Sequence, residues 1–177
     1  MRVWVVRHGC AGDKRHWRGP DEERPLDDVG VRQAEALAVL LADIGIRRIG
    51  SSPTRRCRDT VAPLARRLDL PVEDWSRLGP SSDGAALLDL IVDEGGDRAV
   101  LCTHGETMTS ALAALRAGGA PVPAEADDRL LGKGTVWALT VDDGTIVAFD
   151  HLEPSPPVSC AVHDPPRGAG DRSLTGG

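Results

Sequence analysis

Short apolar runs alternate with longer segments of helical periodicity along most of this chain. Residues 2–6 predict a buried strand, and "RAVLCT" (98–103) is continuously apolar, which is typical of strands covered on both faces of a parallel sheet. "IRRIGSS" (46–52) and "LPVED" (70–74) predict two further strands between them. The polar segment over 10–26 predicts a long loop after the first strand.

The segments between these strands carry apolar residues at helical spacing. Asp27 can cap a helix that extends to about residue 43, and a second helix is expected after "SPTRR" (52–56). A third helix is expected around Leu87, ending before the glycines at 95 and 96, and a fourth over residues 105–116. Strands therefore alternate with helices, as they do in α/β proteins.

The end of the chain has a different pattern. Residues 134–141 and 144–152, joined at "DDG", predict a β-hairpin. Together, these predicted strands and helices indicate an α/β fold over residues 1–152: a single three-layer domain with a mostly parallel sheet and helices on both faces. Residues 153–177 are rich in proline and glycine with little apolar periodicity, which predicts a disordered tail.

Composition and charge disfavour some classes of binding partner. The chain has 177 residues, a net charge of −6 and a pI near 5.3, which disfavours nucleic acid and membrane surfaces as partners. No apolar run reaches the roughly 18 residues of a membrane-spanning helix, and the N-terminus lacks a signal-peptide pattern. The cysteines at 10, 57, 102 and 160 show no CxxC pair, which predicts reduced thiols and a cytoplasmic location.

Candidate chemistry lies where three predicted strands end. Arg7 and His8 follow the first strand, His104 follows "RAVLCT", and "SSPTRR" follows the second strand. Ligands of open α/β sheets bind beyond the carboxyl ends of strands, so these histidines and arginines are expected to converge. A glycine follows each histidine, which allows a sharp turn and close approach of a ligand.

Two guanidiniums and two imidazoles in one pocket form a site for an anion, and phosphate matches the guanidinium geometry. A neutral imidazole can also attack phosphorus and form a phosphohistidine that water hydrolyses. That scheme requires no metal and no cofactor. A metal site built from the cysteines and histidines is disfavoured, because the usual ligand spacings are missing.

Three sequence stretches carry a resemblance to a known family. "VVRHG" (5–9), "SSPTRRCRDT" (51–60) and "LCTHG" (101–105) resemble the signatures of the histidine phosphatase superfamily, also called phosphoglycerate mutase-like. "RPLDDVGVRQAEAL" (24–37) is similar to the stretch that opens this family's first helix. The resemblance covers roughly residues 1–150 and points to the small bacterial phosphohistidine-phosphatase-like branch. The chain is also similar to the phosphatase-like domain that follows a Nudix domain in some bacterial proteins.

The resemblance implies roles for four residues. His8 would be the nucleophile, Arg7 and Arg56 would clamp the phosphoryl group, and His104 would stabilise the transferred group. The family pattern S-P-x-x-R-A-x-x-T favours Arg56 over its neighbour Arg55.

Further candidates for binding phosphate or substrate are Gly9, Ser52, Arg24 and Lys133. Two of them have alternative interpretations. Arg24 could pair with an acid of its own loop, and Lys133 could lie in a solvated turn.

The predicted site also has two candidates for a general acid, which would protonate the leaving oxygen. Asp83 and Glu106 are the candidates, but Asp83 also suits the N-cap of the following helix and Glu106 also suits a helix N-terminus. Without a general acid, the enzyme should prefer substrates with good leaving groups.

The sequence therefore predicts a metal-independent phosphatase that acts through a phosphohistidine intermediate. Its substrate would be a phosphohistidine protein, a phosphoanhydride or a small phosphorylated metabolite. One alternative is a non-catalytic regulatory domain that binds a phosphorylated ligand. A phosphoglycerate-type mutase is disfavoured, because residues 70–97 are too few for the insertion that encloses a sugar phosphate in mutases.

Overall fold

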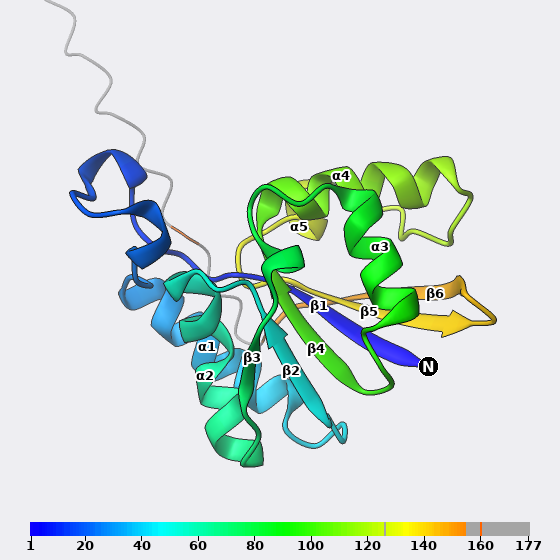
Figure 1. The fold of residues 1–177 in the computed structure, drawn as a ribbon, viewed down its shortest axis with the longest axis horizontal. Coiled ribbons are helices and arrows are strands. Elements are labelled where there is room, and N and C mark those ends of the chain that lie inside the picture. Colours follow the sequence, from blue (N-terminus) through cyan, green and yellow to red (C-terminus); the bar gives the residue numbers. More distant parts are fainter. Residues whose placement is uncertain (126, 155–159, 161–177) are drawn as a thin grey trace, which may run out of the picture.

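The structure is a computed structural model that describes residues 1–125, 127–154 and 160. One mixed sheet has the strand order β3-β2-β4-β1-β5-β6 (Figure 1). The first four strands in sequence are mutually parallel, whereas β5 is antiparallel to both β1 and β6. The strands are β1 Arg2–Arg7, β2 Arg48–Ser51, β3 Val72–Asp74, β4 Ala99–Thr103, β5 Val136–Asp142 and β6 Thr145–Leu152.

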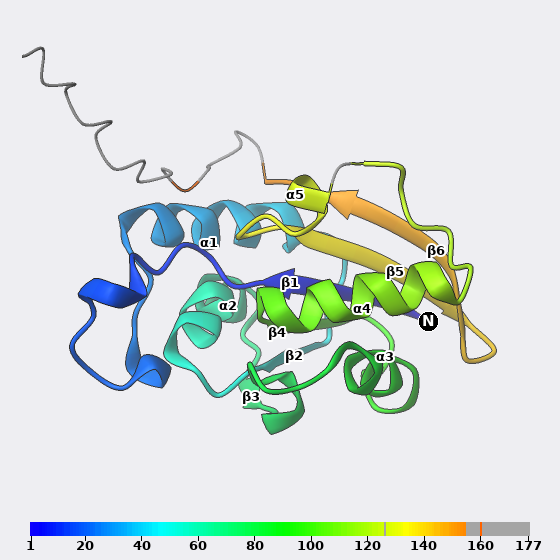
Figure 2. The same cartoon turned by 90° about the horizontal axis from the view of Figure 1, so that it is seen from above.

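Helices cover both faces of this sheet. Helices α1 and α2 lie on one face, and α3 and α4 lie on the other together with the short α5 (Figure 1; Figure 2). The predicted three-layer α/β architecture is confirmed. The helices are α1 Asp28–Leu41, α2 Arg55–Leu68, α3 Gly84–Asp93, α4 Gly105–Ala117 and α5 Asp127–Leu130.

The apolar run of β1 is explained by burial on both faces. Successive side chains of a strand point to opposite faces, so Val3 and Val5 pack toward α3 and α4. Trp4 and Val6 pack toward α1 and α2. All four side chains are buried, which is why no polar residue interrupts the strand.

Local signals in the sequence account for several element ends. The Asp27 side chain accepts a hydrogen bond from Gly30 N and caps α1, as predicted. In the predicted hairpin, Asp143 and Gly144 both have positive φ, 45° and 72°, as a two-residue type I′ turn requires. Helix α5 and the 3₁₀ turns at 14–16, 21–23 and 76–78 were not predicted, since one turn carries no periodicity.

The prediction that all four cysteines are reduced is wrong for one pair. Cys10 and Cys160 form a disulfide with a Cα–Cα distance of 6.0 Å, within the usual range. Cys57 and Cys102 are free and buried, as expected. A pairing across 150 residues leaves no local signal in the sequence. Most of the predicted disordered tail lies outside the described residues.

No helix within the described ranges is long and apolar enough to cross a membrane.

Candidate active site

The register of the sheet brings the predicted site residues to one edge. Arg7, the last residue of β1, pairs with Thr103 at the end of β4. The backbone N–H of His8 donates to the Thr103 carbonyl over 3.1 Å, and that of Ser52 donates to the Cys102 carbonyl over 2.9 Å. Three strands therefore deliver His8, Ser52 and His104 to the same place.

His8 is held as a neutral imidazole with one free ring nitrogen. Its side chain is buried, and Nδ1 lies 2.7 Å from the Gly9 carbonyl oxygen, which can only accept, so Nδ1 carries the proton. The pKa of His8 is lowered to about 3, mainly by burial; the hydrogen bond to Gly9 opposes this effect, and the electrostatic influence of His104, Arg56 and Arg7 adds to it. The unprotonated Nε2 is the atom that a nucleophilic role needs.

Arg56 is the arginine of α2 that enters the site. Its guanidinium is buried, with Nη2 3.2 Å from an Asp21 carboxylate oxygen and 3.4 Å from His104 Nδ1. Arg55 instead is exposed and pairs with Asp59 at 3.5 Å. The geometry therefore selects Arg56, the residue that the family pattern favours.

Arg7 and Arg56 share an unusual feature. The Nε atom of each is buried and has no hydrogen-bond partner among the described residues. Buried guanidinium N–H groups normally find an acceptor, since leaving one unpaired costs free energy. An oxyanion held between the two arginines would satisfy both donors.

His104 is fixed by its neighbours. It is buried, and its ring centroid lies 5.3 Å from that of His8. Its Nδ1 faces Arg56, which can only donate, so in this tautomer Nε2–H donates to Ser52 Oγ over 2.9 Å. Ser52, a candidate for phosphate binding, therefore contacts the second histidine of the site.

Gly9 and Gly105 lie in closely packed surroundings. Neither has a positive φ. A Cβ at Gly105 would lie 2.5 Å from both Cζ and Nη2 of Arg7, and one at Gly9 would lie 3.1 Å from the Gly30 carbonyl oxygen. The expected reason was a sharp turn and ligand approach. The observed reason is that the Arg7 guanidinium rests directly on Gly105.

The long loop after β1 reaches the site through Asp21, which sequence reasoning missed. The Asp21 carboxylate accepts from Arg24 Nε over 3.0 Å and pairs with Arg56. Burial acts to raise the pKa of Asp21, but the hydrogen bond from Arg24 and the charges of Arg56, Arg24 and Lys14 outweigh it and lower that pKa. The acidic stretch "DEE" (21–23) beside Arg24 was the available signal.

Arg24 itself holds this loop. Its Nη1 donates to the carbonyl oxygens of Ala11 and Gly12 over 2.7 and 3.3 Å, and Arg24 is buried. This is the alternative in which Arg24 pairs with an acid of its own loop. Its charge still acts on the site, since it lowers the pKa of Lys133.

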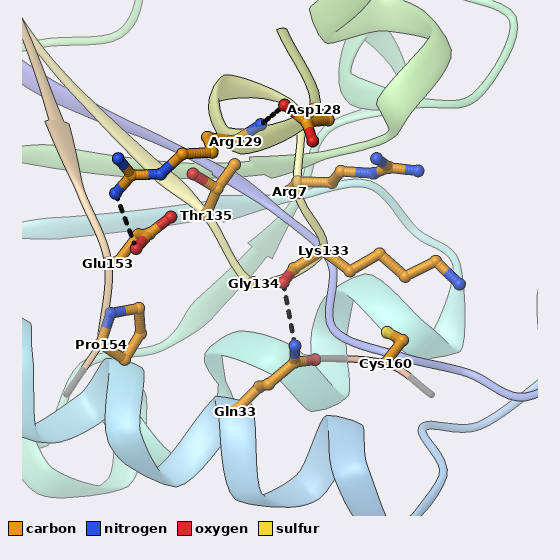
Figure 3. Close-up of a pocket in the computed structure, with 11 residues that line it drawn as sticks. Arg7, Gln33, Asp128, Arg129, Lys133, Gly134, Thr135, Glu153, Pro154 and Cys160 are labelled. Carbon is orange, nitrogen blue, oxygen red and sulfur yellow. Dashed lines mark hydrogen bonds and ion pairs between the residues drawn. The ribbon is translucent and has the colours of Figure 1, made fainter. Parts of the chain in front are cut away.

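Lys133 lies beside Arg7 in the segment before β5. Both side chains line a cavity of about 360 Å³, together with Gln33, Arg129, Glu153 and Cys160, and they extend in the same direction (Figure 3). The Lys133 side chain is half-buried. Burial lowers its pKa, and the positive charges of Arg7, Arg24 and Arg56 lower it further against the opposing effect of Asp27.

The two candidate general acids have different surroundings. The Asp83 carboxylate accepts a hydrogen bond from Ala86 N over 2.7 Å and caps α3, which is its predicted alternative role. Glu106 is exposed on the first turn of α4. Burial lowers the pKa of Arg7, and the charge of Glu106 acts to raise it, so this carboxylate lies within electrostatic reach of the site.

A neutral buried histidine, a second histidine and two arginines whose buried Nε atoms are unpaired among the described residues define the class: an α/β protein with a site for a phosphate-like anion. A family model described as "Histidine phosphatase superfamily (branch 1)" matches residues 3–80. Over these residues the match agrees with the resemblance to the histidine phosphatase superfamily that the sequence motifs predict.

One curated relative is the 8-oxo-(d)GTP phosphatase of Mycolicibacterium smegmatis, 32% identical over 157 residues. The match covers 86% of this chain and 48% of that protein. The chain therefore spans about half the length of this relative. A second match, to a mycobacterial protein, is 40% identical over 75 residues and covers 36% of that protein.

Solved structures share the fold. The protein histidine phosphatase SixA complexed with tungstate superposes with a TM-score of 0.66 at 24% identity, covering 87% of this chain and 97% of that one. The putative phosphohistidine phosphatase SixA from Agrobacterium tumefaciens gives a TM-score of 0.64 at 25% identity, covering 86% and 97%. These likenesses agree with the single α/β domain described above.

Proposed function

We propose that this chain is a metal-independent phosphatase that transfers a phosphoryl group to His8 and then to water. One observation carries the proposal: the buried Nε donors of Arg7 and Arg56 lack partners among the described residues, and both arginines act electrostatically on a neutral histidine. Such donors are suited to the equatorial oxygens of a transferring phosphoryl group. The cationic surroundings disfavour a metal ion at this point.

In the proposed reaction, His8 Nε2 attacks phosphorus while the bond to the leaving oxygen breaks and its electron pair stays on that oxygen. The Gly9 carbonyl holds the proton on Nδ1 and accepts more strongly as the ring gains positive charge. Arg7, Arg56 and His104 stabilise the phosphoryl oxygens. Water then attacks the phosphohistidine, which releases orthophosphate and returns the electron pair to Nε2.

The substrates proposed are phosphohistidine proteins, phosphoanhydrides or small phosphorylated metabolites. The names of the relatives, a protein histidine phosphatase and an 8-oxo-(d)GTP phosphatase, support both of the first two classes. In Asp83 the carboxylate is occupied in capping α3. Glu106 is then the remaining candidate acid, and without protonation by Glu106 the site favours substrates whose leaving groups need no proton.

The test is hydrolysis of p-nitrophenyl phosphate by the purified protein in the presence of EDTA. His8→Ala should reduce kcat by about a thousandfold or more, as removal of a nucleophile does. His16→Ala is the control, since His16 is exposed on the first loop and pairs with Asp13. Undiminished turnover in His8→Ala, or loss of the wild-type activity in EDTA, would contradict the proposal.

A cytoplasmic location stays a prediction. The disulfide between Cys10 and Cys160 removes the argument from reduced cysteines. Fractionation of the bacterial cells that produce the protein, followed by immunoblotting, measures its location directly.

A further inference from the structure

Lys133 is fixed relative to the nucleophile by hydrogen bonds of its own backbone segment. The Gln33 side chain donates to the Lys133 carbonyl over 2.9 Å and accepts from Cys10 N over 2.8 Å. The next residue, Gly134, donates from its N–H to the Arg7 carbonyl over 3.2 Å. The loop that carries His8 and the segment that carries Lys133 therefore form one rigid unit.

The ammonium of Lys133 has little negative charge to neutralise it. No ion pair within 4.0 Å joins it to any acid of the described ranges, whereas Lys14, the other lysine of the chain, pairs with Asp21 at 3.9 Å. Among the charges with the largest effect on Lys133, those of Arg7, Arg24 and Arg56 lower its pKa and that of the Asp27 carboxylate raises it. The oxygens of this carboxylate already accept from Gly30 N and Gly12 N, each over 2.8 Å.

Lys133 and Arg7 stand on the wall of one cavity. Its volume, about 360 Å³, lies in the range of small-molecule sites, and Figure 3 shows Arg7 and Lys133 among its lining residues. Arg7 is also one of the two arginines proposed to clamp the phosphoryl group, so it belongs to both the cavity and the phosphoryl site. A half-buried cation next to a phosphate clamp is placed for a second anionic group bonded to the first. A phosphohistidine does not supply one, because its leaving group is an imidazole.

We propose that Lys133 binds the penultimate phosphate of a phosphoanhydride substrate, with the organic group of a nucleoside diphosphate in the cavity that Lys133 and Arg7 line. This inference rests on the proposed function and selects one of its substrate classes.

The proposed step is balanced without a general acid. His8 Nε2 forms a bond to the terminal phosphorus, and the bond from that phosphorus to the bridging oxygen breaks. The electron pair stays on the bridging oxygen, so the departing nucleoside monophosphate gains one negative charge, which Lys133 stabilises. Water hydrolyses the phosphohistidine, and its proton leaves with orthophosphate.

The experiment compares Lys133→Met with wild type on two substrates, GDP and p-nitrophenyl phosphate. The second has one phosphoryl group and an uncharged aromatic ring. The ratio of kcat/KM for GDP to kcat/KM for p-nitrophenyl phosphate should fall by roughly 10- to 100-fold, the loss expected for a hydrogen bond between charged groups. Lys14→Met is the matched control, and its ratio should stay within about twofold of wild type, as for a surface ion pair.

Binding tests the subsite without turnover. In a His8→Ala background, Lys133→Met should weaken calorimetric binding of a methylene-bridged GDP analogue by about tenfold. An unchanged ratio or unchanged affinity overturns the Lys133 assignment. So does turnover of p-nitrophenyl phosphate without turnover of GDP, which leaves the proposed phosphatase standing. A third outcome separates the two proposals. If wild type hydrolyses neither substrate but Lys133→Met still binds the analogue about tenfold more weakly, the proposed phosphatase activity is overturned and the phosphate-binding role of Lys133 stands.

Discussion

At the scale of single residues, the site depends on groups held in one protonation state by burial. His8 is the clearest example, because the same burial that leaves Nε2 free to attack also makes protonation of the ring costly. Arg7 shows the steric counterpart. Its guanidinium occupies the space that a Cβ at residue 105 would fill. Burial therefore sets the protonation state of His8, whereas the small size of Gly105 sets the space available to the neighbouring Arg7.

The depressed pKa of His8 predicts a pH dependence of stability. Between pH 6.5 and about pH 3, the unfolded chain binds a proton at His8 that the native chain does not bind. Acidification through that window therefore lowers the free energy of unfolding, and this loss is absent above pH 6.5. From pH 8 to pH 5 the contribution of His8 is about 2 kcal/mol.

The measurement is urea unfolding at pH 8 and pH 5. His8→Gln should lose about 2 kcal/mol less than wild type over this range. His16→Gln, at an exposed position, should lose as much as wild type. If wild type and His8→Gln lose equal free energy, His8 is not held neutral by the fold.

At the scale of elements, the strand ends alone do not assemble the site, since α2 must also be joined to the loop after β1. Thr60 makes this connection. Its Oγ1 accepts from Gly9 N over 3.0 Å and donates to the Arg56 carbonyl over 2.6 Å, one turn earlier in the same helix. The nucleophile loop and the helix that carries Arg56 therefore share one buried hydroxyl.

Thr60→Val preserves the shape and removes the hydroxyl. The buried Gly9 N–H then lacks its acceptor, so we expect a loss of about 1–3 kcal/mol in the free energy of unfolding. Displacement of His8 from Arg56 should lower kcat/KM for p-nitrophenyl phosphate by roughly 10- to 100-fold. Thr145→Val, at an exposed position of β6, is the control for both measurements. Wild-type kcat/KM in Thr60→Val would show that this connection does not position the site.

The elements most readily predicted from the sequence are those with local causes. The apolar run of β1 follows from burial on both faces, and the cap at Asp27 and the turn at Gly144 follow from single residues. The strand ends also predicted that His8 and His104 would meet. Asp21 could not be placed in this way, because its position in the site depends on its contact with Arg56, which is distant in sequence.

At the scale of the whole molecule, one covalent bond closes almost the entire chain. The disulfide joins Cys10, two residues after the nucleophile, to Cys160, with a sequence separation of 150. Cys160 lines the cavity that also contains Arg7 and Lys133. The bond therefore fixes one wall of the proposed substrate cavity to the loop that carries His8, and it constrains the unfolded chain.

Removal of this bond should destabilise the protein. Cys160→Ser is expected to lower the free energy of unfolding by about 2–4 kcal/mol under oxidising conditions, because the unfolded chain loses a long-range constraint. Dithiothreitol should bring wild type down to the level of the variant in urea unfolding and leave Cys160→Ser unchanged, since Cys57 and Cys102 are already free. Mass spectrometry after alkylation in denaturant without reductant supplies the direct check. Two modified cysteines per chain are expected, and four would show that the bond does not form.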